Sequence, residues 1–212
     1  MADQHIEIRP ITEDEWPDWE RSAARAFGEH SDPVMQAFIR SITEIERILD
    51  AFQNGRVVGS AASYTFELTV PGARVPFPFV DIVTVQPTHR IRGPLIRMMR
   101  QQMEDFRERG EFVTGLTASE SSIYSRYGRG IAVWGEDWSI SREQTIMSRA
   151  PTLSGETQFV DPDEMRQNWS GVYDRVRRDR VGMFNISDAW WEGFSQDPLP
   201  RRRRASAFFH VA

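Results

Sequence analysis

The segment "VTVQPTHRIRG" (residues 83–93) places a strand pattern, two arginines and a glycine directly before a helical pattern. Pro94 fits the first position of that helix, because the N–H group that a proline lacks would have no intrahelical partner there. The positive end of a helix dipole attracts anions, and Arg90 and Arg92 would add charge to it. The turn at residues 90–93 therefore predicts a phosphate-binding site, with a solvated arginine-rich loop as the alternative.

The helix predicted over residues 94–109 is apolar on one face. Gly110 follows it, in the position where a glycine commonly ends a helix. The apolar face consists of Leu95, Met99, Met103 and Phe106. A helix that packs by this face would present the turn at its N-terminus.

Several other chemistries are excluded by residue type. The chain has no Cys, and all 26 Lys-plus-Arg residues are Arg, which excludes thiolate nucleophiles, disulfides, Schiff-base lysines and a P-loop lysine. The turn lacks the glycine patterns of nucleotide hydrolases and dinucleotide dehydrogenases. Histidines stand at positions 5, 30, 89 and 210 without metal-ligand spacing, so no metal site is predicted. His89 lies on the phosphate turn and is assigned no catalytic role.

Hydrophobic periodicity predicts a mixed α/β fold (α+β, with a mixed sheet) in the order βααββαβαβ. The 212 residues are enough for one domain of about 150 residues and a remainder. The strands are expected within 5–10, 54–72, 74–85, 111–118 and 131–142, and the helices within 17–29, 31–52, 94–109 and 120–127. The segment at 54–72 begins with the turn signal Asn54-Gly55 and ends in Pro71-Gly72, so it is expected to be a hairpin strand.

The domain is expected to span residues 1–150, and residues 151–212 differ from it. "APTLSGE" has the composition of a linker, and the polar amphipathic stretch that follows ends in "ASAFFHVA", a strand pattern with no later strand as a partner. A piece of this size seldom buries enough surface to fold alone.

Two motifs give the sequence a family resemblance. "VTVQPTHRIRG" matches V-x-V-x-P followed by R-x-x-G, and "YSRYG" (residues 124–128) matches Y-x-x-x-G. Together they resemble the GCN5-related N-acetyltransferases (GNAT), in which the turn cradles the pyrophosphate of acetyl-coenzyme A. Residues 26–29, 117–130 and 187–192 are further similar to the Eis-type (enhanced intracellular survival) aminoglycoside acetyltransferases.

The Eis-type resemblance implies a longer protein, in which a second domain of the same fold and a sterol-carrier-like domain follow the first. The resemblance therefore implies that residues 151–212 are a linker and the truncated beginning of a second GNAT-like domain. The family uses the carboxylate of its own C-terminus to help deprotonate the acceptor amine, and Ala212 does not correspond to that terminus. A non-catalytic module that binds coenzyme A or a partner protein therefore stands beside the enzyme as an alternative.

The resemblance also assigns roles to residues. Tyr124 is expected to be the general acid that returns a proton to the departing thiolate, with Tyr127 as its rival. The backbone of Val83, Thr84 and Val85 is expected to bind the pantetheine arm. The remaining cofactor-binding residues are expected to be Ile91, Arg92, Gly93, Pro94, Leu95, Ile96, Ser119 and Glu120. Pro94 departs from the family pattern, because it cannot offer an N–H group to phosphate.

Charge indicates the kind of acceptor. Residues 1–50 hold 12 acidic and 5 basic residues, and an acidic face would attract a polycationic amine such as an aminoglycoside or a basic peptide. A solvated helix surface would explain the same charges. Arg201–Arg204 indicate a solvated loop rather than a nucleic-acid site, because the chain is acidic overall, with a net charge of -5.

No stretch of the sequence predicts a membrane or secretion signal. The N-terminus is polar and acidic, and no apolar run approaches the roughly 20 residues of a membrane helix. A cytoplasmic protein with a small-molecule amine acceptor is expected. A homo-oligomer is consistent with the family resemblance.

Overall fold

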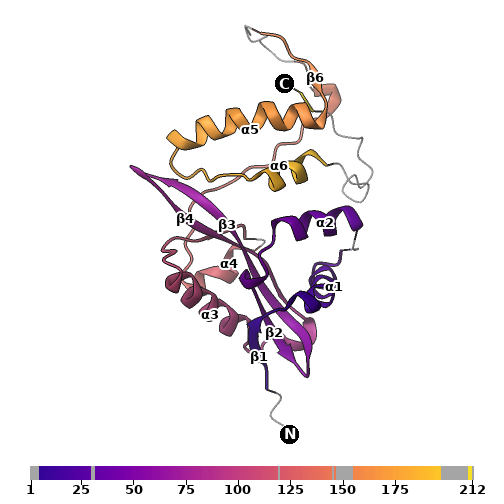
Figure 1. Ribbon diagram of the computed structural model, residues 1–212, viewed down its shortest axis with the longest axis vertical. Coiled ribbons are helices and arrows are strands. Elements are labelled where there is room, and N and C mark those ends of the chain that lie inside the picture. Colours follow the sequence, from indigo (N-terminus) through magenta and orange to yellow (C-terminus); the bar gives the residue numbers. More distant parts are fainter. Residues whose placement is uncertain are drawn as a thin grey trace.

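The computed structural model describes residues 5–29, 32–118, 120–144, 146, 155–196 and 210–211. A five-stranded sheet in the order β1-β2-β3-β4-β5 forms its centre (Figure 1). Its strands are β1 (Glu7–Pro10), β2 (Ile48–Gln53), β3 (Arg56–Val70), β4 (Ala73–Val85) and β5 (Gly115–Leu116). The first four strands pair antiparallel and β5 pairs parallel with β4, so the predicted mixed α/β class is confirmed.

Helices cover both faces of the sheet and one end of it. The α-helices are α1 (Trp16–Phe27), α2 (Pro33–Ile42), α3 (Pro94–Glu108), α4 (Ser121–Tyr124), α5 (Pro162–Asp179) and α6 (Asp188–Ser195). Short 3-10 helices are η1 (Glu13–Glu15), η2 (Ile45–Arg47), η3 (Pro87–His89), η4 (Ser125–Tyr127) and η5 (Arg142–Gln144). Within the described residues, no helix has the length and apolar character that crossing a membrane requires.

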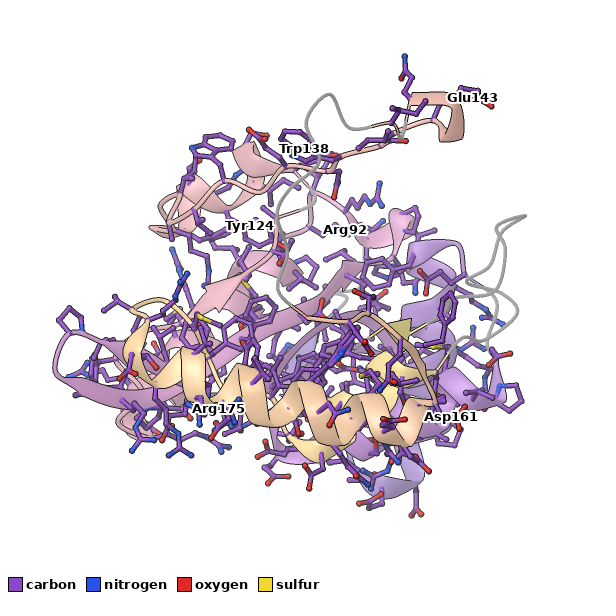
Figure 2. The ribbon with its side chains drawn as sticks, turned by 90° about the horizontal axis from the view of Figure 1, so that it is seen from above. Arg92, Tyr124, Trp138, Glu143, Asp161 and Arg175 are labelled. Atoms are coloured by element: carbon purple, nitrogen blue, oxygen red, sulfur yellow. The ribbon has the colours of Figure 1, made fainter. Side chains whose placement is uncertain are left out.

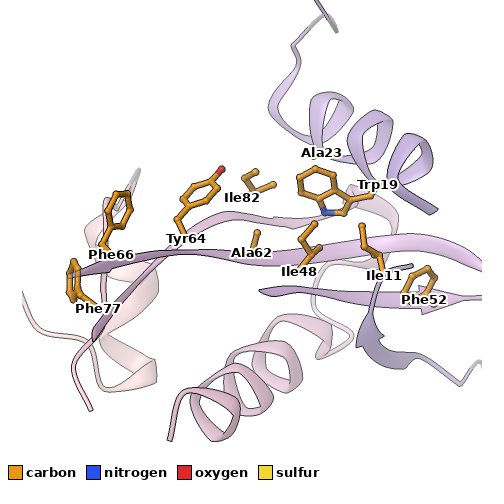
Figure 3. Packing of buried hydrophobic residues seen from close by; sticks show 10 residues of the cluster. All are labelled: Ile11, Trp19, Ala23, Ile48, Phe52, Ala62, Tyr64, Phe66, Phe77 and Ile82. Carbon is orange, nitrogen blue, oxygen red and sulfur yellow. The ribbon is translucent and has the colours of Figure 1, made fainter. Parts of the chain in front are cut away.

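Two apolar clusters hold the layers together. On one face Trp19 of α1 is buried over Ile48 and Ala62, as Figure 3 shows. Its indole Nε1 donates a hydrogen bond of 2.8 Å to Ser60 Oγ, so the ring is fixed as well as buried. On the other face α3 contributes Met98 to the second cluster. Because successive strand residues point to opposite faces, β2 and β3 serve both clusters.

The predicted turns on either side of β3 are confirmed. Asn54 and Gly55 join β2 to β3 with φ of 51° and 72°, the positive values that a two-residue hairpin turn requires. Pro71 and Gly72 join β3 to β4, and Gly72 has φ of 77°. The long paired strands β3 and β4 therefore support the first residues of the segment at 83–93.

The helix predicted over residues 31–52 is wrong in its second half. α2 ends at Ile42, and β2 follows as a central strand whose six residues are all buried. A strand covered on both faces has no alternation of apolar and polar residues, so its pattern resembles that of a buried helix. The strand predicted at 54–72 is confirmed as β3, and its partner β2 is the strand that was missed.

Two predicted strands are shorter or absent. The strand expected over 111–118 is reduced to Gly115–Leu116, and residues 131–141 form neither helix nor strand. The second segment has strand-like residues, yet Val133, Trp134 and Trp138 are about 80% exposed, at 83%, 78% and 81%. Figure 2 shows it extending away from the body of the protein toward Glu143. Propensity alone does not make a strand when no neighbouring strand pairs with it.

The α3 helix begins and ends as predicted, but its buried face is rotated. Gly110 has φ of 75° and the N–H of Glu111 donates to the carbonyl of Phe106 at 2.9 Å, which is a helix-ending motif. Met103 is 38% exposed. Met98 and Gln102 are buried in its place.

The helices α5 and α6 pack across the distal part of the β3–β4 hairpin, as Figure 1 shows. The N–H of Thr69 donates to the carbonyl of Met183 at 2.8 Å, and the N–H of Asn185 donates to the carbonyl of Glu67 at 3.0 Å. The expected strand in 205–212 is described at β7 (His210–Val211), which pairs with β6 (Phe159–Val160). Arg201–Arg204 lie outside the described residues.

Candidate active site

The sheet opens between β4 and β5. β5 pairs only with Phe79 and Val80, whereas β4 continues to Val85. The predicted residues Val83, Thr84 and Val85 therefore lie on β4 beyond its ladder with β5, while they remain close to β3 on the other side. An extended strand edge of this kind can accept the amide groups of an elongated ligand.

A bulge marks the point where the ladder ends. Ala62 pairs with Asp81 and Ser60 with Thr84, so Ile82 and Val83 together face the single residue Ala61. Ile82 has φ of 50°, which is unfavourable for a β-branched residue, and its N–H donates to Asp81 Oδ1 at 2.8 Å. Backbone strain of this kind concentrates at functional sites, where it aims a backbone group.

The predicted phosphate turn has a second strained backbone position. Ile91 adopts φ of 68° with its side chain fully exposed, and Gly93 adopts φ of 86° as the N-cap of α3. A left-handed conformation costs a residue with a Cβ atom roughly 1–2 kcal/mol, and burial of Ile91 does not offset that cost. Turns that alternate in this way direct backbone N–H groups into a concave surface that binds anions.

The surroundings of the turn suit a polyanion. Arg90 and Arg92 are exposed on it, and Pro94 is buried at the first helical position, as predicted. Leu95 and Ile96 follow in the first turn of α3, where N–H groups have no intrahelical acceptor. A Cβ atom added to Gly93 would find its nearest neighbour only at 3.9 Å, so the space beside the turn is open.

His89 holds the turn against the β2–β3 hairpin. Its Nε2 lies 2.7 Å from Gln53 Oε1, and its Nδ1 lies 2.8 Å from Thr88 Oγ1. Both ring nitrogens are thus engaged in local contacts. These two contacts fix the imidazole ring between the turn and the end of β2.

Tyr124 and Tyr127 are both half-buried, but they have different neighbours. Tyr127 packs against the apolar cluster under α3. The pKa of Tyr124 is raised above its ordinary value, mainly because burial removes water; Arg129 opposes this shift and Asp81 adds to it. The Tyr124 phenol is therefore protonated at neutral pH, which is the state that its predicted role as general acid requires. Glu120 is exposed before α4, and Ser119 lies outside the described residues.

A groove of about 460 Å³ separates α3 from the segment at 126–129. Its lining is apolar at Ile96, Met99, Met103 and Tyr127, and charged at Arg100, Glu104, Arg107, Arg126 and Arg129. Arg129 Nη2 lies 3.6 Å from Met103 Sδ. Of the predicted cofactor-binding residues, Ile96 alone is among these lining residues, so the groove extends away from the turn.

Asp81 lies beside the predicted segment at 83–85, although no sequence motif includes it. It stands in the apolar strand "VPFPFVDIVTV" and its side chain is exposed. Desolvation nevertheless raises its pKa. Its negative charge in turn contributes to the raised pKa values of Tyr64 and Tyr124. The sequence signal that could have identified Asp81 is its position as the one charged residue in the long apolar stretch at 75–85.

Many acids of the first 50 residues are already neutralised. Arg9 donates two hydrogen bonds to the carboxylate of Glu15, from Nη2 to Oε1 at 2.6 Å and from Nη1 to Oε2 at 2.8 Å. These hydrogen bonds lower the pKa of Glu15 to about 2. Further ion pairs join Glu7 to Arg9, Glu13 to Arg40, Asp18 to Arg21, and Glu44 to Arg47. The uncompensated negative charge of this region is therefore smaller than its acid count suggests. Among the described residues, no group of His, Asp or Glu could hold a metal ion.

The comparisons with known proteins agree with this geometry. The family described as acetyltransferase (GNAT) domain matches residues 7–132, and the chain belongs to this family. An N-acetyltransferase of Streptomyces avermitilis, named as uncharacterised, is 36% identical over 194 residues, which are 88% of this chain and 46% of that protein.

The Eis-type resemblance is also supported. The N-acetyltransferase Eis of Mycobacterium tuberculosis is 30% identical over 190 residues, 85% of this chain and 47% of that protein. The crystal structure of Eis1 from Mycobacterium abscessus superposes with a TM-score of 0.70 at 30% identity, over 90% of this chain and 47% of that chain. The chain thus spans about half the length of these relatives.

Proposed function

We propose that the chain carries an N-acetyltransferase site that moves acetyl from acetyl-coenzyme A to a primary amine. The observation that carries the proposal is the continuity of two features. β4 extends beyond its ladder with β5, and only the short helix η3 separates it from the left-handed turn at the N-terminus of α3. A ligand with an amide-bearing arm and a pyrophosphate would find both parts of its site on one stretch of chain.

The residues present fit acetyl-coenzyme A. Val83, Thr84 and Val85 would receive the pantetheine arm along the strand edge, and Arg92 with the turn at 91–96 would hold the pyrophosphate. Pro94 offers no N–H group, so the arginines and the neighbouring amides must supply the contacts. Ser119 and Glu120 belong to the same proposed set.

The chemistry needs one proton donor and no covalent enzyme intermediate. The neutral amine attacks the thioester carbonyl, a C–N bond forms, the C–S bond breaks, and the amine nitrogen loses a proton to solvent. Tyr124 gives its phenolic proton to the departing sulfur and is then reprotonated by solvent. The absence of Cys and Lys from the sequence is consistent with direct transfer.

We propose a polycationic acceptor of the aminoglycoside kind, because Eis-type relatives are similar over most of this chain. A cytoplasmic location belongs to the same proposal. Residues 151–212 are proposed to be a linker and the beginning of a second GNAT-like domain. A binding module that holds coenzyme A without turnover is the second candidate, since the chain matches about half of each relative.

Calorimetry with coenzyme A tests the donor site. The 1–212 chain should bind, and Arg92→Glu should weaken binding at least about 10-fold, because one charge-assisted contact is worth roughly 1.5–3 kcal/mol. Arg175→Glu on α5 is a matched control, because Figure 2 shows Arg175 far from Arg92. Absence of binding in the unmodified chain, or equal losses in both variants, would contradict the proposal.

A further inference from the structure

We propose that Asp81 binds the ammonium group of the acceptor and thereby makes the site specific for cationic amines. This inference rests on the proposed acetyltransferase function and adds the residue that recognises the second substrate. It assigns a specificity role to a residue outside the motifs at 83–93 and 124–128.

The position of Asp81 is the first support. It pairs with Ala62 and follows Val80, the last residue of β4 in the ladder with β5. It therefore lies where the sheet opens, two residues before the predicted pantetheine segment at 83–85. A group bound there is adjacent to the end of the donor, where the acetyl group must lie.

The face of the sheet is the second support. Ala62 and Phe79 belong to the cluster that α1 covers, and the bulge turns Ile82 to that face as well. Asp81 is two residues from Phe79 along β4 and thus shares its face. The α3 groove belongs to the cluster on the opposite face, so it is separate from the face on which Asp81 lies.

Charge is the third support. Carboxylates elsewhere in this protein are commonly paired with arginine, as Glu15 is with Arg9 and Glu111 with Arg47. Within the described part of the chain, Asp81 forms no ion pair, and the one hydrogen bond that it accepts comes from its own neighbour, the N–H of Ile82. An exposed carboxylate at a partly desolvated sheet opening is suited to receive a cation from a ligand.

The aromatic surroundings favour an amine over a metal ion. Burial raises the pKa values of Tyr64 and Tyr124, and the negative charge of Asp81 adds to both shifts, so both side chains are neutral phenols. A neutral phenol and a carboxylate can share the donors of one ammonium group, and a ring face adds attraction for a cation. Within the described residues, the site lacks the further acidic ligands that a metal would need.

The test uses the 1–212 chain with tobramycin as the amine probe, measured by calorimetry with and without coenzyme A. Asp81→Asn keeps an Oδ1 acceptor for the Ile82 N–H and removes only the charge. We expect tobramycin affinity to fall about 10-fold or more and coenzyme A affinity to change less than about 2-fold. Asp81→Glu should retain most of the affinity. Asp105→Asn on α3 is a matched control and should equal the unmodified chain.

The outcomes separate this inference from the proposed function. Equal tobramycin affinity in Asp81→Asn and the unmodified chain would overturn the role of Asp81, even if coenzyme A binds. Failure of the unmodified chain to bind tobramycin would overturn it as well. If coenzyme A does not bind but tobramycin binding depends on Asp81, the acetyltransferase proposal fails and the amine site stands. Thermal unfolding of each variant distinguishes lost charge from lost folding.

Discussion

At the scale of single residues, Tyr124 is the proposed acid, and its rival is three residues away. Replacing Tyr124 by Phe removes the phenolic proton and little volume, so kcat should fall by roughly 10²-fold while coenzyme A affinity stays nearly unchanged. Steady-state kinetics in an active acetyl-transfer assay, together with calorimetry, measures both quantities. Tyr127→Phe is the matched control, because Tyr127 packs against the α3 cluster. A larger loss in Tyr127→Phe than in Tyr124→Phe would reverse the assignment.

Asp50 is a buried titratable residue whose protonation affects the free energy of unfolding. It is fully buried on β2, and neither carboxylate oxygen has a hydrogen-bond partner among the described residues. Desolvation raises its pKa from 3.8 to about 7, although the hydroxyl of Ser60 across the ladder and the charge of Arg9 lower it somewhat. The folded state therefore binds this proton more tightly than the unfolded state does.

The sign of the resulting pH dependence follows from linkage. Between about pH 4 and pH 7 the unfolded state loses the Asp50 proton first, so this residue lowers the free energy of unfolding as pH rises. The total loss is on the order of 4 kcal/mol. Asp50→Asn should remove this slope and be roughly 2–4 kcal/mol more stable than the unmodified chain at pH 8. Urea unfolding at pH 4 and pH 8 measures the difference, and a difference independent of pH would contradict the argument.

At the scale of elements, the helices and strands that could be predicted are those bounded by characteristic residues in their own sequence. The turn at Asn54–Gly55, the proline at the start of α3 and the glycine after its end are local features, and each is found where it was expected. β2 carries no such signal, because its position in the middle of the sheet buries all six of its residues. Its identity depends on β1 and β3 as neighbours, which no short window of sequence contains.

The candidate site likewise has parts that the sequence could predict and parts that depend on strand pairing. The strand at 83–85 and the turn at 90–93 follow one another along the chain, so the sequence could place them together. The bulge at Ile82 and the exposure of Asp81 depend on the register of β4 against β3, which shifts by one residue there. A change of register is a property of two paired strands, and for this reason Asp81 was found only in the structure.

At the scale of the whole molecule, the segment at 162–195 and the sheet share one apolar cluster. Phe184 lies between the rings of Phe66, Phe77 and Phe79, with centroid distances of 4.9, 5.9 and 6.0 Å. Trp190 of α6 packs edge-on against Tyr64 at 5.2 Å. Arg177 of α5 is nearly buried and contacts Glu67 at 3.1 Å. These contacts couple the stability of α5 and α6 to that of the acetyltransferase sheet.

Phe184→Ala tests this coupling. Removing a partly buried aromatic ring from the cluster should lower the free energy of unfolding by about 2–3 kcal/mol. Because the cluster includes residues of both the sheet and the segment at 162–195, the loss should appear in one cooperative transition. Circular dichroism during urea unfolding measures the transition. Trp138→Ala is the control, because its ring is 81% exposed and its removal should change stability by less than about 0.5 kcal/mol. Two separated transitions, only one of them shifted by Phe184→Ala, would show instead that the two parts unfold independently.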